Sequence, residues 1–151
     1  MQKITPFLWF NGNLEKAINF YTETFKNAEI TSIRRNGDTI FTATFKLEGM
    51  EFMGIDGGPM YQFTEAVSFF IKCSTQEEVD YYWDKLSEGG AISRCGWLKD
   101  QFGVSWQVIP DTLGQLLGAP DQQKAQRVIA AMMGMRKIIV ADLQAAYDGN
   151  S

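Results

Sequence analysis

A repeated pattern of one strand, one helix and three further extended segments constrains this chain more than any other feature. A constant shift aligns the helices of the two halves and pairs Asn13 with Thr75, Ala17 with Val79, and Tyr21 with Trp83. At the last strand of each half, residues 49–53 fall on residues 103–107. Repeats of this length indicate a fold built from repeated supersecondary units. We therefore expect two β-α-β-β-β modules.

The elements of the first module follow from spacing and turn signals. Asn11-Gly12-Asn13 ends an aromatic-rich apolar run, and apolar residues then recur at helical spacing. Asn36-Gly37 is a hairpin signal, and the segment after it alternates apolar and polar side chains, as a half-buried strand does. The sequence therefore predicts strands at about 4–10, from 28 to the Asn36-Gly37 turn, at 39–47 and at 51–56, with a helix over about 14–25.

The second module begins after the linker that Gly57-Gly58-Pro59 opens. A strand over Val67 to Cys73 leads into a helix whose capping box is Thr75-Gln76-Glu77-Glu78. Extended segments are expected at 91–94, 96–99 and 104–109, and helices follow Pro110. The predicted fold class is α+β, one domain over 1–151, with modules at about 3–58 and 66–110 and a helical appendix at about 111–148.

Composition narrows the partners of the chain. The chain has 14 Lys and Arg against 18 Asp and Glu, which disfavours nucleic acid and an anionic membrane surface as partners. No apolar run approaches the roughly 18 residues that a membrane span needs, and the first residues do not resemble a signal peptide. We expect a cytoplasmic protein that binds a small molecule. Cys73 and Cys95 are expected to be free thiols, with a redox role as the alternative.

Several strings resemble a known family. They are Pro6-Phe7-Leu8-Trp9-Phe10, Phe20-Tyr21, Met53 to Pro59 and, most specifically, Gly96 to Pro110. Over residues 2–140 the chain resembles the PhnB-like branch of the vicinal oxygen chelate superfamily, which contains the glyoxalases and bleomycin-resistance proteins. This branch is also labelled the 3-demethylubiquinone-9 3-methyltransferase family. The resemblance implies curved sheets that form a cup around a small ligand, and a homodimer.

In catalytic members of that superfamily four side chains, usually His and Glu, hold a divalent metal. The resemblance places these positions near Pro6, Met53, Ser68 and Gln107, and the chain has no histidine. None of the four is a strong ligand for a hard cation, so we expect no metal at these positions. We also expect no cofactor, because the first strand leads to Asn11-Gly12-Asn13 and not to the glycine-rich loop of a dinucleotide-binding domain.

Strand alternation, counted from the four aligned positions, predicts which side chains line the cup. The expected lining is Pro6, Leu8, Phe10, Glu51, Met53, Ile55, Ser68, Phe70, Ser105, Gln107 and Ile109. The expected ligand-binding residues among them are Leu8, Phe10, Met53, Ile55, Ser68, Phe70, Ser105 and Gln107. Trp9, Phe69 and Trp106 have the opposite parity and are expected to pack against the helices. Such a lining is mostly apolar, with a few polar groups to orient a ligand.

Three functions remain open at this point. The favoured one is metal-independent binding, with Gln107 and Ser68 orienting the ligand; the alternative role of Gln107 is a plain hydrogen bond to Ser68 or Ser105. The second is an enzyme that uses Glu51 or Asp56 as acid or base with Gln107 as a hydrogen-bond donor. A partner-binding protein, with its cavity filled by its own side chains, is the third.

Two more groups have a structural and a chemical interpretation. Asp56 and Asp100 precede tight turns, where aspartates commonly accept backbone hydrogen bonds. Cys95 beside Gly96 would need an activating group to serve as a nucleophile, and no histidine is present to provide one.

Overall fold

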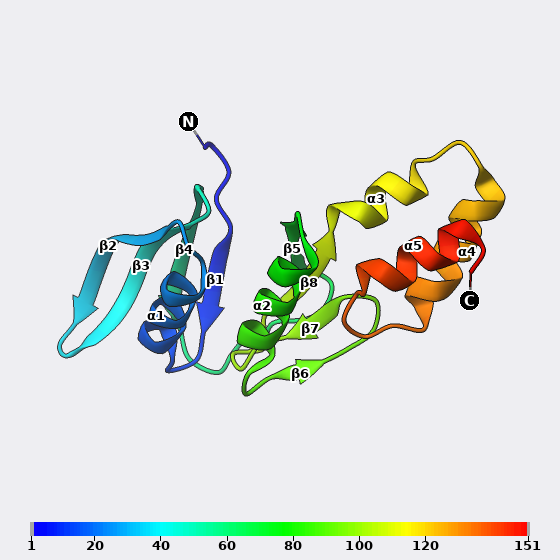
Figure 1. Ribbon diagram of the computed structural model, residues 1–151. Helices are drawn as coiled ribbons and strands as arrows, with labels where there is room; N and C mark the ends of the chain where they lie inside the picture. Colours follow the sequence, from blue (N-terminus) through cyan, green and yellow to red (C-terminus); the bar gives the residue numbers. More distant parts are fainter. Residues whose placement is uncertain (1, 151) are drawn as a thin grey trace. The chain divides into compact units, whose positions relative to one another are not determined.

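The computed structural model describes residues 2–150, and the chain divides after Phe63 into two compact units. Figure 1 shows that each unit contains a sheet with a helix against it. The predicted α+β class with two strand-helix modules is confirmed. The single domain expected over residues 1–151 stays a prediction.

The first unit has a four-stranded mixed sheet in the order β1-β4-β3-β2. Its elements are β1 (Phe7–Phe10), α1 (Leu14–Thr24), β2 (Ala28–Asn36), β3 (Thr39–Leu47) and β4 (Met50–Asp56). β1 runs parallel to β4, whereas β2, β3 and β4 are joined by antiparallel pairing. The β2–β3 turn contains Gly37 at φ +65°, the left-handed conformation that the Asn-Gly signal predicts.

The core of the first unit lies between α1 and one face of its sheet. Tyr21 of α1 stacks on Phe45 at 6.4 Å between ring centroids, and Phe45 stacks on Phe52 at 5.5 Å. Gly54 of β4 lies directly under Leu14, because a Cβ at Gly54 would stand 2.7 Å from the Leu14 Cδ1 atom. The helix predicted over 14–25 is therefore present and buries the expected stripe.

The predicted facing of β1 is wrong. Leu8 and Phe10 were expected on the open face, but both are buried, and the Phe10 ring lies on the same side of Gly54 as α1. The parallel register pairs Phe7 with Met53, so Phe7 and not Pro6 shares the open face with Met53. Counting from Pro6 therefore assigns the wrong parity to β1. A shift of one residue moves every side chain of a strand to the other face.

Trp9 shares the open face with Phe7 for the same reason, which corrects its expected packing against a helix. The Trp9 ring packs on Gly57, and its Nε1 donates to the Gly58 carbonyl at 2.9 Å. Tyr61 meets the same ring edge-on at 5.0 Å between centroids. The Gly57-Gly58 segment therefore closes against β1, because a side chain at Gly57 would collide with the indole.

The second unit repeats this topology in the order β5-β8-β7-β6, with β5 parallel to β8. Its elements are β5 (Ser68–Cys73), α2 (Gln76–Ser87), β6 (Ala91–Ile92), β7 (Trp97–Lys99) and β8 (Ser105–Pro110). The Thr75 hydroxyl accepts from the Glu78 amide at 3.1 Å, as the capping box predicts, while the Glu78 carboxylate accepts from the Ser74 amide at 2.7 Å. The two sheets have equivalent strand orders, with β8 in the place of β4 and β5 in the place of β1, which confirms the repeat.

The appendix folds as three helices, α3 (Asp111–Leu117), α4 (Gln122–Met133) and α5 (Val140–Asp148). They enclose a small core made of Ile109, Leu113, Val128, Ile138 and Leu143. Gln76 at the start of α2 fastens this appendix, because its amide donates to the Ile138 carbonyl at 3.0 Å and accepts from the Val140 amide at 2.7 Å. Among residues 2–150 no helix is long and apolar enough to cross a membrane.

Candidate functional site

The open face of the second sheet carries three polar side chains that the sequence singles out, Ser68, Ser105 and Gln107. Pairing across β5, β8 and β7 places them in rows. The rows are Ser68, Ser105 and Lys99; then Phe70, Gln107 and Trp97; then Lys72 and Ile109. Side chains of the opposite parity, Trp106 and Val108, are buried on the α2 side. Strand alternation therefore placed Ser68, Phe70, Ser105 and Gln107 on the correct face, and ligand binding by them stays a prediction.

Gln107 is paired with Ser68. Its amide nitrogen donates to the Ser68 hydroxyl oxygen at 3.0 Å, which is one of the two hydrogen bonds that the sequence left open. A glutamine also has a carbonyl oxygen, and this atom accepts no hydrogen bond from residues 2–150. Because Gln107 is only half-buried, this oxygen is the polar acceptor in the middle row of the open face.

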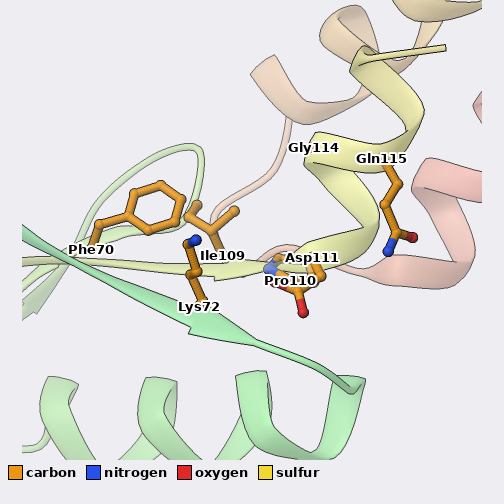
Figure 2. A pocket seen from close by; sticks show the side chains of 7 residues that line it. All are labelled: Phe70, Lys72, Ile109, Pro110, Asp111, Gly114 and Gln115. Carbon is orange, nitrogen blue, oxygen red and sulfur yellow. The ribbon is translucent and has the colours of Figure 1, made fainter. Parts of the chain in front are cut away.

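A cavity of about 350 Å³ lies at the far end of this face, where the sheet meets the appendix. It is lined by Phe70, Lys72, Ile109, Pro110, Asp111, Gly114 and Gln115. Figure 2 shows the Phe70 ring and the Lys72 amine on the strand side and the Gln115 amide on the α3 side. Phe70 is 53% exposed, so its ring is an open apolar wall and not part of the packed core. The cavity combines apolar surface with one cation, one anion and an amide.

A second, smaller cavity of about 230 Å³ lies near the opposite end of the face. It is lined by Glu65, Ala91, Ile92, Ser93, Trp97, Leu98, Lys99 and Ser105. The Lys99 amine is 2.7 Å from the Glu65 carboxylate, and its hydrogen bond holds the pKa of that carboxyl below its ordinary value. Ser105 is buried, and its hydroxyl has no hydrogen-bond partner among the described residues.

Asp100 positions the strands that carry Lys99 and Ser105. One carboxylate oxygen accepts from the amides of Phe102 and Val104 at 2.9 and 3.0 Å, and the other accepts from Trp106 Nε1 at 2.9 Å. The carboxylate is 3% exposed and fixes the tight turn between β7 and β8. The turn-stabilising role expected of Asp100 is confirmed, and Trp106 is buried as predicted.

The two carboxylates proposed for acid or base chemistry belong to the first unit. Asp56 accepts a very short hydrogen bond from the Gly12 amide, so it caps the turn between β1 and α1. Glu51 is half-buried, and its carboxylate is 3.5 Å from the Thr5 hydroxyl. Met53 and Ile55 follow it at alternate positions of β4 and therefore share its side of the strand. Gln107 lies in the second unit, so joint action of Glu51 or Asp56 with Gln107 stays a prediction.

The donor set at the four aligned positions does not fit a divalent metal. The Pro6 carbonyl already accepts from the Met53 amide at 2.9 Å, and Met53 offers only a thioether. The Ser68 oxygen already accepts from Gln107. In the described part of the chain no three His, Cys, Asp or Glu side chains gather as a metal site would require. Of the four side chains, only those of Ser68 and Gln107 suit hydrogen bonding, and both are neutral.

Both cysteines are free thiols, as expected. Burial raises the pKa of Cys73 to about 12, so its thiolate is nearly absent at neutral pH. Cys95 is half-buried at φ +59°, and its sulfur lies 3.9 Å from that of Met133. Neither sulfur has a histidine beside it, because the chain contains none.

Sequence reasoning missed the charged residues around the two cavities. Lys72 continues the alternation of β5 by one step beyond Phe70 and could have been found in this way. Lys99 faces Ser105 across the turn, which also follows from correct strand pairing. Glu65, Asp111 and Gln115 have no such signal, because they reach the cavities only through the packing of a linker and of α3.

Comparison with known proteins places the chain in a family. A family model described as 3-demethylubiquinone-9 3-methyltransferase matches residues 2–109, and no curated protein matches. A PhnB protein of Bacillus cereus, described by the same methyltransferase name, is 42% identical over 72% of this chain and 99% of its own, with a TM-score of 0.69. The family match ends before α3, so the appendix lies outside it.

Two more distant structures show the fold alone. A Pseudomonas aeruginosa protein is 22% identical over 73% of this chain and 98% of its own, with a TM-score of 0.65. The fosfomycin resistance protein FosX of Listeria monocytogenes, solved with Mn(II) and sulfate, is 17% identical over 70% of this chain and 89% of its own, with a TM-score of 0.53. With the repeat and the family match together, the chain belongs to the 3-demethylubiquinone-9 3-methyltransferase family.

Proposed function

We propose that this protein binds a small, largely apolar molecule without a metal ion, in the manner of the bleomycin-resistance type of its superfamily. The observation that carries the proposal is the cavity of about 350 Å³ that continues the open face of the second sheet between β5 and α3. This volume is at the lower end of the range of small-molecule sites, which is roughly 300–1,000 Å³. A ligand of one or two rings fits such a space.

In this proposal, residues at and beside the cavity supply apolar contact and one hydrogen bond to the ligand. The exposed Phe70 ring offers a flat apolar surface, and Ile109 forms the floor beside it. Gln107 does not line the cavity, but it is paired with Phe70 in the neighbouring strand and presents a carbonyl oxygen that can accept one hydrogen bond from a ligand that extends along the face. Apolar contact then supplies most of the affinity, and the amide fixes the orientation.

Methyl transfer and acid-base catalysis receive no support from the described residues. The turn after β1 is closed by Asp56 on Gly12, where a cofactor-binding domain would carry a glycine-rich phosphate loop. That hydrogen bond also occupies one of the two carboxylates that the enzyme hypothesis needs. The proposal is therefore a binding protein. We propose separately that it is located in the cytoplasm.

A thermal-shift screen with small aromatic and aliphatic compounds tests the proposal, because a ligand raises the stability of the state that it binds. We expect Phe70→Ala and Gln107→Leu each to weaken a screening hit by about tenfold. Ile129→Ala is the matched control, since Ile129 is an exposed apolar side chain on α4, outside the cavity. Hits that bind equally well to all three variants would contradict the proposed site.

We also propose a homodimer, as the family resemblance implies. The open face of the first sheet supports this idea, because Phe7 of β1 leaves a large apolar ring exposed there, beside Met53 of β4. Light scattering on a sizing column measures the mass in solution. The expected result is the mass of two chains, and the mass of a single chain at micromolar concentration would contradict it.

A further inference from the structure

The buried hydroxyl of Ser105 is a polar group that the fold leaves unused. The side chain is 1% exposed, and among residues 2–150 nothing forms a hydrogen bond with its oxygen. Ser68, which pairs with Ser105 across the strands, accepts a hydrogen bond from Gln107 and forms none with the Ser105 hydroxyl. A buried hydroxyl without a partner is unfavourable, and such groups in native proteins commonly serve a ligand or a bound water.

Lys99 stands on the other side of Ser105 in the same row of the sheet. Its amine is held by Glu65, a carboxylate from the segment before β5, and both side chains line the cavity that contains Ser105. The Lys99 and Glu65 side chains are 42% and 64% exposed. Ion pairs as exposed as this one contribute little to stability, so another carboxylate can replace Glu65 at small cost.

The walls of the cavity define the rest of the ligand. Trp97 and Ile92 add apolar surface beside the lysine, and Ile92 is partly exposed. One lysine, already paired with one carboxylate, matches a single negative charge. The row that contains Gln107 lies next to the row of Ser105 and Lys99, about 7 Å along the strand, so one ligand can reach both.

We propose that this cavity is a subsite for a monocarboxylate, which displaces Glu65 from the Lys99 amine and accepts a hydrogen bond from the Ser105 hydroxyl. The inference rests on the proposed function, because it assigns a carboxylate group to the ligand of the same sheet face. Glu65 then acts as a resident substitute for the ligand, occupying Lys99 until the ligand arrives. The apolar part of the ligand lies against Trp97.

Benzoate and its neutral analogue benzamide are the probes. Nuclear magnetic resonance of the full chain follows the Trp97 indole N–H, which is assigned with Trp97→Phe. We expect benzoate at pH 7 to shift this signal with saturation and benzamide to bind at least about tenfold more weakly, since a charged acceptor forms the stronger hydrogen bonds. Equal binding of the two probes would overturn the proposal.

Three variants and two controls identify the groups responsible. Lys99→Met and Ser105→Ala should each weaken benzoate about tenfold, and Glu65→Gln should strengthen it by up to about fivefold, the equivalent of removing a competing surface ion pair. Lys85→Met and Glu77→Gln change the same charges at exposed positions of α2 and should leave binding unchanged. Weaker benzoate binding to Glu65→Gln would show that Glu65 assists the ligand, which contradicts displacement.

Two further readings separate this inference from the proposed function. Ser105→Ala should keep or raise the melting temperature, because its hydroxyl has no partner to lose among the described residues, so weaker binding cannot be attributed to misfolding. If benzoate fails to bind while screening hits still depend on Phe70 and Gln107, the carboxylate subsite is wrong and the proposed function stands. If benzoate binds with the expected dependence while no hit depends on Phe70 or Gln107, only the proposed function fails.

Discussion

Replacing Asp100 by asparagine tests how the turn between β7 and β8 is held. The carboxylate accepts three hydrogen bonds from Phe102, Val104 and Trp106, and it is almost fully buried. In Asp100→Asn the remaining carbonyl oxygen can still serve the two backbone amides. The new NH₂ group then faces the indole N–H of Trp106, so one charge-assisted hydrogen bond is lost and a buried donor is left unpaired. Together these effects cost about 2–4 kcal/mol of the free energy of unfolding.

Urea denaturation followed by tryptophan fluorescence measures this loss. A double-mutant cycle with Trp106→Phe isolates the hydrogen bond, because the phenyl ring has no N–H to leave unpaired. In the Trp106→Phe background the Asp100→Asn change should cost about 1–2 kcal/mol less. Asp84→Asn on the exposed side of α2 is the control, with an effect within about 0.5 kcal/mol. A loss below about 0.5 kcal/mol for Asp100→Asn, or the same loss in both backgrounds, would refute the reasoning.

Three other predictions concern the appendix and the thiols. Gln76→Leu removes the hydrogen bonds to Ile138 and to Val140 at the start of α5 and should lower stability by about 1–3 kcal/mol, with faster proteolysis of α4 and α5; unchanged proteolysis would contradict the fastening role. Hydrogen bonds from Gln76 and Lys137 hold the pKa of Asp80 below its ordinary value, so its contribution is present above the unfolded-state pKa and lost as pH falls through the lower, folded-state pKa. Asp80→Asn should therefore lower the melting temperature slightly at pH 7 and not at pH 2, and an equal loss at both would contradict it. At pH 8 a thiol reagent should modify the Cys73→Ala variant, through Cys95, much faster than Cys95→Ala; similar rates would contradict the burial of Cys73.

The sequence was sufficient for the modules because their signals are local. Helical spacing around Tyr21, the capping box at Thr75 and the Asn36-Gly37 turn each act within a few residues, and the structure contains all three. The predicted facing of β1 is wrong because it depends on contacts that are not local. The sequence places the first inward side chain at Pro6, whereas pairing with β4 begins at Phe7, and only the partner strand determines that register.

The site was predictable only to the level of the sheet face. Alternation alone placed Phe70 and Gln107 on the open side, since a strand has only two sides. The Ser105 hydroxyl is unpaired because Gln107 donates its hydrogen bond to Ser68. From the sequence, Gln107 could equally have bonded to Ser105. The larger cavity also needs Gln115, which reaches it through the packing of α3 against the sheet. Such contacts join elements far apart in the chain, so spacing carries no signal for them.

The absence of histidine gives a first indication against metal chemistry, and the packing adds a second. The aligned positions hold a proline whose carbonyl is used, a thioether, and a serine and a glutamine bonded to each other. A neutral set of this kind suits a ligand that brings its own hydrogen-bonding groups. The proposed binding therefore depends on the side chains of the open face.

Native mass spectrometry before and after dialysis against EDTA tests the central claim, metal-independent binding of a small organic molecule, most directly. The purified protein, incubated with the tightest hit of the thermal-shift screen, should keep one organic molecule per chain after chelation and show no mass of a divalent ion before it. A divalent ion bound in stoichiometric amount, whose removal by EDTA also releases the organic molecule, would contradict the account.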